Sequence, residues 1–148
     1  IRVLISVSPV RYLRAGIVES ASSKAVLRAL SQELIEDYDF VHYFPAWEFM
    51  MDDLRDYRFY ARDLAHPSDL AEDYIWEKFS NCWLSEDARR INAELESVFR
   101  DLAHRPRAPK SEAHIQFLKK LLDKVNRLRN VVDLDLEYVE IEERLGLR

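Results

Sequence analysis

A run of apolar and β-branched residues opens the chain and most limits what it can fold into: Ile1-Arg2-Val3-Leu4-Ile5-Ser6-Val7-Ser8. Such a nearly continuous run is typical of a strand buried in a parallel sheet. Pro9 ends the predicted strand. Because the run begins abruptly and without a methionine, we interpret it as an internal strand of a longer protein.

The next segments predict a strand, helix and strand unit. A serine cluster (Ser20, Ser22 and Ser23) offers N-caps for a helix whose apolar stripe is Leu27, Leu30, Leu34 and Tyr38. Residues 40–44 favour a second strand, stopped by Pro45, which makes a right-handed βαβ unit. Two strands do not make a stable parallel sheet, so we expect further strands upstream of Ile1.

Residues 46–83 predict a short helix near 46–53, an irregular loop, and a longer helix to about residue 83. Pro67 is favourable in a first helical turn, and Asp69 complements the positive end of the helix dipole. The buried face of the longer helix is expected to hold Ala71, Ile75, Phe79 and Cys82. His66 would then lie beyond the carboxyl ends of the strands, where α/β enzymes bind their ligands.

From Ser85 onward the pattern changes to two long amphipathic helices. Their apolar stripes are Ile91, Leu95, Val98, Phe99 and Leu102, and then Ile115, Leu118, Leu121, Leu122, Val125 and Leu128. The stretch 104–110 separates them, and Ser111 can cap the second. We expect residues 1–83 to be part of an α/β domain, with residues 84–148 as a helical hairpin and tail packed on it. Residues 133–143 alternate as an edge strand would, whereas 138–147 can also be helical.

Composition excludes several classes of function. The chain of 148 residues is 48% hydrophobic, which is enough for one domain with a core. Its net charge is −5 and neither half has a basic excess, so nucleic-acid binding is not expected.

No apolar run approaches the roughly 20 residues of a membrane span, and residues 1–10 lack a signal-peptide pattern. A single cysteine, Cys82, excludes an internal disulfide and predicts an inert packing residue. A cytoplasmic location is the default expectation.

The sequence Asp63-Leu64-Ala65-His66-Pro67 carries the strongest chemical signal. A carboxylate three residues before a histidine, on a loop that leads into a helix, can hydrogen bond one ring nitrogen and leave the other free to accept a proton. Asp63 and His66 are therefore the candidate catalytic pair. A nucleophile is missing: the two glycines do not neighbour a serine, and neither Ser6 nor Ser8 has the Gly-flanked turn that activates one.

Spacing alone also allows structural roles for both histidines. His66 can be a helix-capping histidine beside a solvated acid, and His42 can be a core or sheet-end histidine. A metal site of His42, Asp63 and His66 lacks a further convergent ligand, so no metal and no cofactor is predicted.

Two further groups fit structural roles as well. Alternating charges around Arg55, Arg58 and Arg62 are more typical of solvated salt bridges than of an anion grip. Trp76 and Trp83 are expected to be core or helix-docking residues rather than a sugar platform.

Several words in a fixed order over roughly residues 3–80 resemble the C-terminal half of the GSCFA family: Ser8-Pro9-Val10-Arg11, Val18-Glu19-Ser20, Ser23-Lys24-Ala25, Tyr43-Phe44-Pro45, Asp53-Leu54-Arg55-Asp56-Tyr57-Arg58-Phe59-Tyr60, His66-Pro67-Ser68 and Tyr74-Ile75-Trp76. That family resembles the SGNH hydrolases, whose fold is a flavodoxin-like three-layer α/β/α sandwich and whose last conserved block is Asp-x-x-His. Asp63 and His66 match that block. The resemblance implies a serine-type ester or acyl hydrolase in which Asp63 orients His66 and His66 is the base.

This sequence also departs from the family pattern. The chain lacks the Gly-Ser-Cys-Phe-Ala motif of the family. It also lacks the Gly and Asn positions of an oxyanion hole, and we expect all of these upstream of Ile1. The leading hypothesis is the general-base part of a hydrolase acting on an ester of a saccharide or another small molecule, completed by the upstream half of the same domain. The 148 residues alone are then expected to be inactive. The alternative is a non-catalytic interaction module whose C-terminal helices dock a partner and whose Asp–His pair is vestigial.

Overall fold

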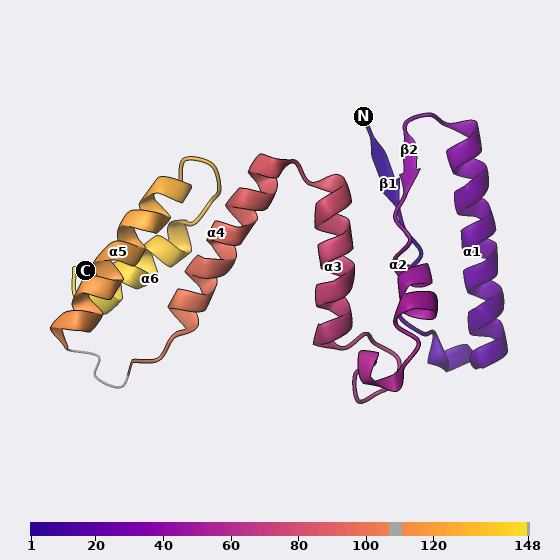
Figure 1. Cartoon of the computed structure of the whole chain (residues 1–148), viewed down its shortest axis with the longest axis horizontal. Helices are drawn as coiled ribbons and strands as arrows, with labels where there is room; N and C mark the ends of the chain where they lie inside the picture. The colour runs from indigo at the N-terminus through magenta and orange to yellow at the C-terminus, as the bar shows by residue number, and fades with distance from the viewer. Residues whose placement is uncertain (107–110, 148) are drawn as a thin grey trace. The chain divides into compact units, whose positions relative to one another are not determined.

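A computed structural model describes residues 1–106 and 111–147. The chain divides into two compact units, Ile1–Trp83 and Leu84–Arg148 (Figure 1). The described residues are mostly helical and contain one small parallel sheet, so the chain is of mixed α/β character.

The first unit is built on a parallel β1–α1–β2 unit, as the sequence predicted. Strand β1 (Val3–Ile5) pairs with β2 (Val41–Tyr43) in the register Val3↔Val41, Leu4↔His42 and Ile5↔Tyr43. Both strands are shorter than predicted. The residues of β1 are half-buried rather than buried, because β2 is the only strand that pairs with it in the described sheet. In Figure 1, α1 (Ile17–Asp37) and α3 (Asp69–Trp83) flank the strands on opposite sides.

Helix α1 begins earlier than predicted. A short 3-10 turn, η1 (Leu13–Ala15), leads to Gly16, whose φ of 90° lies in the left-handed region that favours glycine. The carbonyl of Gly16 accepts the amide of Ser20, so Gly16 replaces the serine cluster at the helix start.

The face that α1 turns inward was also predicted wrongly. Leu27, Leu30 and Tyr38 are about half exposed, whereas Ser31 is buried. The inward face is partly polar and its polar groups have partners: Ser31 Oγ donates to the carbonyl of Leu27, and Arg28 Nε donates to Glu48 at 3.0 Å. These bonds satisfy the polar groups on this face. Of the predicted stripe, only Leu34 is half-buried, and the other three residues stay outside.

The segment between β2 and α3 winds tightly around a small core. Helix α2 (Ala46–Glu48) continues as the π-helix η2 (Phe49–Asp53), which confirms the predicted short helix, and a 3-10 turn, η3 (Tyr57–Phe59), follows. The core joins this segment to α3 through Met50, Leu54, Tyr60 and Ala71.

The predicted buried face of α3 is correct only in part. Ala71 is fully buried, and Ile75 and Phe79 are half-buried. Cys82 is exposed, so its prediction as a buried packing residue was wrong. The reason is that the core of the first unit lies against the beginning of α3 and does not reach its last turn.

The second unit is a bundle of α4 (Glu86–Ala103), α5 (Glu112–Leu128) and α6 (Asp135–Leu145). Ser85 and Ser111 cap α4 and α5 by accepting the amides of Ala88 and His114. The apolar stripes pack on one another and on α6, with a core of Val98, Leu102, Leu118, Leu121, Val125, Leu128, Leu134 and Ile141. The tail is therefore helical, so of the two alternatives left open by the sequence the helix is confirmed and the edge strand is not. Most of the predicted separator, residues 107–110, lies outside the described residues.

Among the helices of residues 1–106 and 111–147, none combines the length and the apolar character that crossing a membrane requires.

Candidate functional site

Asp63 and His66 lie on a tight turn that is closed by backbone hydrogen bonds. Tyr60 and Pro67 form an antiparallel bridge, and the amide of Ala61 donates to the carbonyl of His66 at 2.8 Å. The amide of Ser68 donates to the carbonyl of Phe59 at 2.9 Å, just before α3 begins. The two candidate residues therefore lie at the tip of a small hairpin that is fixed at its base.

Within this turn the Asp63 carboxylate holds both the backbone and the ring of His66. Its Oδ1 accepts the amides of Ala65 and His66 at 2.9 and 3.0 Å, and its Oδ2 lies 2.6 Å from Nδ1 of His66. The two backbone bonds, followed by the bond from the imidazole, lower the pKa of Asp63 to about 2. The carboxylate is thus ionised over the whole physiological range.

The His66 ring is open on its other side. Its side chain is 62% exposed, and in the part of the chain that the structure describes, Nε2 makes no hydrogen bond. The ring bonds Asp63 and no backbone group of α3, which does not match a helix-capping histidine. With a carboxylate on Nδ1, the neutral ring is favoured as the Nδ1-protonated tautomer, which leaves the Nε2 lone pair accessible.

Arg11 supports the turn from a distant part of the sequence. Its Nη1 donates to the carbonyl of Leu64 at 3.2 Å, and its guanidinium lies 3.9 Å from the centre of the Tyr60 ring. Its backbone amide donates to the carbonyl of Ala65 at 3.0 Å. Leu64 has a φ of 57°, which is unfavourable for a leucine and requires such support.

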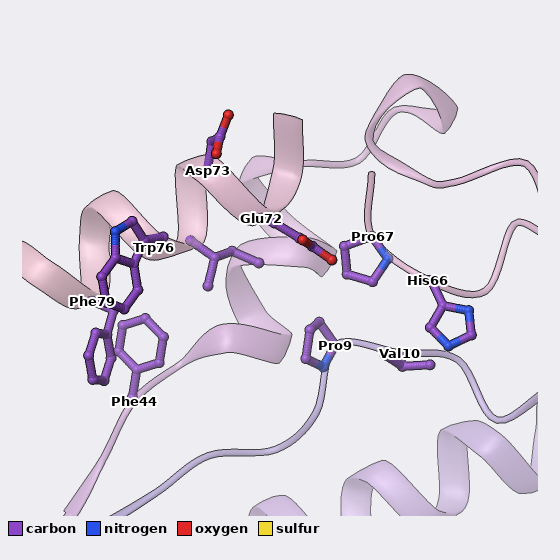
Figure 2. A pocket seen from close by; sticks show the side chains of 10 residues that line it. Pro9, Val10, Phe44, His66, Pro67, Glu72, Asp73, Trp76 and Phe79 are labelled. Carbon is purple, nitrogen blue, oxygen red and sulfur yellow. The ribbon is translucent and has the colours of Figure 1, made fainter. Parts of the chain in front are cut away.

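An open pocket of about 640 Å³ lies beside His66 (Figure 2). His66 and Pro67 line one end, and Phe44, Trp76 and Phe79 line the other. Trp76 stacks on Phe79 with ring centres 5.5 Å apart, and Phe79 meets Phe44 edge to face at 5.3 Å. In Figure 2 the Glu72 side chain reaches toward Pro67, between these ends, while Asp73 points away from the pocket. The pocket therefore joins a histidine to an aromatic wall.

The pocket corrects one prediction and adds residues that the sequence did not single out. Trp76, expected to be a core or helix-docking residue, is 43% exposed and forms part of the wall. Phe44 and Glu72 were not predicted as site residues. They come from separate elements, so no short sequence motif contains both of them. In the sequence, Arg11 was noted only as part of the Ser-Pro-Val-Arg motif, and no role was predicted for it.

Other candidate residues do not join the pair. Ser6 Oγ donates to the carbonyl of Phe44 at 2.7 Å, and Ser8 Oγ accepts the amide of Val10, so each hydroxyl is bonded to a backbone group. His42 is half-buried in β2, with its ring 5.5 Å from that of Trp83. Within residues 1–106 and 111–147, no three His, Cys, Asp or Glu residues gather where they could hold a metal ion.

Of the three arginines considered as an anion grip (Arg55, Arg58 and Arg62), two make contacts within their own loop. Arg55 Nε donates to the carbonyl of Asp52, and the Arg58 guanidinium lies over the Phe59 ring at 4.8 Å. Both contacts lie within the loop that carries them, and none of these arginines lines the pocket beside His66.

Comparison with family models decides the relationship of the chain. The model described as "GSCFA family" matches residues 1–79, and that described as "GSCFA domain protein, C-terminal domain" matches residues 95–146. The chain belongs to the GSCFA family. The turn with Asp63 and His66 and the pocket beside it lie within the first GSCFA match, and the helices of the second unit largely coincide with the second. Neither the curated proteins nor the solved structures that were compared with this GSCFA chain include a match.

Proposed function

We propose that this GSCFA chain carries the acid–base pair of an SGNH-like ester or acyl hydrolase, with His66 as the general base and Asp63 as its orienting carboxylate. The observation that carries the proposal is the 2.6 Å contact between Asp63 Oδ2 and His66 Nδ1, on a turn that leaves Nε2 open beside a pocket. An accessible, oriented imidazole is what proton abstraction from a hydroxyl nucleophile requires.

The contacts of Asp63 suit that role chemically. Because its carboxylate accepts two backbone amides, its position is set before any substrate binds. Its low pKa keeps it ionised when His66 takes up a proton, so the imidazolium forms beside a negative charge. A fixed carboxylate of this kind lowers the barrier by orientation and by electrostatics, without becoming protonated itself.

The pocket beside His66 is the proposed substrate site. Its aromatic and proline surfaces suit the apolar part of an ester, and Trp76 offers a flat face to a saccharide ring. The Glu72 carboxylate, which reaches between the two ends of this pocket, disfavours an anionic substrate. The substrate class is therefore an uncharged ester of a saccharide or another small molecule.

A hydrolase of this type also needs a nucleophile and an oxyanion hole. The chain contains no Gly-Ser motif. We propose that the upstream half of the same domain supplies the nucleophile and the oxyanion hole. In this proposal β1 and β2 belong to the sheet of a three-layer α/β/α sandwich, with α1 and α3 on its two faces.

The alternative, a module whose C-terminal helices dock a partner, has less support. Most residues of the apolar stripes of α4 and α5 that would form the docking face pack on each other and on α6, and Phe99, 49% exposed, is an exception. Val98, Leu118 and Val125 have almost no exposed surface left.

The proposal is tested in a protein that joins this chain to its upstream half. We expect His66→Ala and Asp63→Asn each to lower kcat for a short-chain ester by about three to four orders of magnitude, with little change in thermal unfolding. The double variant should lose little more than the worse single variant, because the pair acts as a unit. Unchanged turnover by folded His66→Ala protein would reject the assignment.

A further inference from the structure

A second pocket of about 410 Å³ lies on the first unit, between the loop that follows β1, the start of α1 and the α2–η3 segment. Its lining includes Arg11, Ser20, Lys24, Trp47, Met51 and Tyr57. It meets the pocket beside His66 only at Pro9 and Val10, which line both. Neither Asp63 nor His66 lines it, although Arg11, which bonds the carbonyl of Leu64 in their turn, lies in its wall.

The charge of this pocket is positive although the net charge of the chain is −5. Arg11 and Lys24 contribute the charge, and none of the described lining residues is an Asp or Glu. In the part of the chain that the structure describes, neither cation forms a salt bridge, in contrast to Arg28, which pairs with Glu48 at 3.0 Å.

Both cations keep hydrogen-bond donors for a ligand. Lys24 Nζ uses one of its three donors on the carbonyl of Ser8 at 2.5 Å, and the Arg11 guanidinium uses one of its five, on Nη1, on the carbonyl of Leu64. These bonds fix the direction of each side chain and neutralise neither charge. Partial burial lowers the pKa of Lys24, which indicates that its ammonium is incompletely solvated.

Aromatic and thioether side chains form the remaining wall. Trp47 and Met51 are half-buried, and Tyr57 is 70% exposed at the mouth. An apolar wall beside two unpaired cations is complementary to a molecule with one flat apolar part and one anionic part.

We propose that this pocket binds a small organic anion, with its carboxylate or phosphate on Lys24 and Arg11 and its apolar part against Trp47, Met51 and Tyr57. The anion supplies the negative charge that the pocket lacks, and it meets donors that are already directed by backbone carbonyls. Guanidinium and ammonium groups bind carboxylates and phosphates by charge-assisted hydrogen bonds.

The experiment compares charged and neutral probes of similar shape on the unaltered 148-residue chain. Benzoate, phenyl phosphate and benzamide are titrated separately, and binding is followed by amide chemical shifts at Ser20, Lys24 and Trp47. We expect at least one anion to bind there about tenfold or more tightly than benzamide. A preference between the two anions distinguishes a carboxylate site from a phosphate site. Equal binding of benzamide, or no shift with either anion, would overturn the proposal.

Substitutions then test the named cation. Lys24→Met should weaken anion binding about tenfold, Lys24→Arg should retain most of it, and Lys78→Met, outside the pocket, should have no effect. Anion binding that survives Lys24→Met unchanged contradicts the assignment. The benzoate and benzamide comparison needs no variant, so it decides the matter even if a substitution prevents folding. Because no readout uses ester turnover, failure here is separate from failure of the hydrolase proposal.

Discussion

Oδ2 of Asp63 lies 2.6 Å from Nδ1 of His66, while Oδ1 of the same carboxylate accepts the backbone amides of Ala65 and His66. One side chain therefore fixes both the turn and the ring that the turn presents. The position of the imidazole is coupled to the local backbone, because neither can move without breaking bonds to the same carboxylate.

The first prediction concerns the tautomer of His66 in the 148-residue chain. We expect the neutral ring to carry its proton on Nδ1, and Asp63→Asn to lose this preference because an amide can donate as well as accept. Long-range proton–nitrogen NMR of the ring measures the tautomer directly. Asp69→Asn, at the start of α3, is the control and should leave the tautomer unchanged. A ring protonated on Nε2 in the unaltered chain would contradict the structure.

A second prediction concerns Arg11, which holds the turn at Leu64 and Tyr60. Arg11→Gln removes the guanidinium, so we expect the amides of Ala65 and His66 to exchange with deuterium about fivefold faster, as the loss of about 1 kcal/mol predicts. Arg14→Gln in the exposed η1 turn is the matched control. Equal exchange in both variants would show that the backbone bonds alone hold the turn.

How far the sequence predicts this fold depends on whether the deciding contacts are local. The tail illustrates the limit: Leu134, Leu136 and Tyr138 alternate as in a strand, yet the residues that pack in the core are Leu134, Tyr138, Ile141 and Leu145, at helical spacing. Alternation over so few residues fits both periods, and contacts with α5 decide between them.

The candidate site shows the same difference between local contacts, which the sequence predicts, and long-range contacts, which it does not. The Asp-x-x-His pair is visible in the sequence because its members meet across a single four-residue turn. Arg11 is not visible from spacing, because it reaches Leu64 across 53 positions. Phe44 and Trp76 line one pocket only after the strand and the helix that carry them have packed together.

The third prediction concerns Tyr43, whose hydroxyl donates to Glu48 beneath α1. Burial first, and the Glu48 carboxylate next, raise the pKa of Tyr43 to about 12. A raised pKa in the folded state means that the contribution to stability is complete below about pH 10 and is lost as the pH rises toward 12. Spectrophotometric titration of folded Tyr43→Phe should lack one ionisation near pH 12, whereas Tyr57→Phe should retain it. An unchanged titration of Tyr43→Phe near pH 12 would contradict the assignment.

The fourth prediction tests the core of the second unit. Leu118 is 1% exposed and Leu136 is 83% exposed. Leu118→Ala leaves a cavity and should lower the free energy of unfolding by about 2–5 kcal/mol, whereas Leu136→Ala should change it by less than about 0.5 kcal/mol. Denaturant unfolding of the two variants measures the difference, and similar values for both would contradict the bundle.

The last prediction concerns self-association of the 148-residue chain. In the described sheet β1 and β2 pair only with each other, so each strand has an edge with unpaired backbone groups. On α1, Ile17, Val18 and Val26 are 83%, 73% and 66% exposed. Open edges and exposed apolar side chains each favour association, so light scattering should show a mass that rises with concentration.

Substitutions separate the apolar face from the effect of charge. Val18→Lys combined with Val26→Lys should shift association to higher concentration, because it removes apolar surface from α1. Ser22→Lys combined with Ser23→Lys adds the same charge to the same helix and keeps both valines, so it should shift association much less. If both pairs act equally, charge repulsion accounts for the effect and the apolar face does not. A chain that stays strictly monomeric at every concentration would contradict the prediction for the strand edges as well.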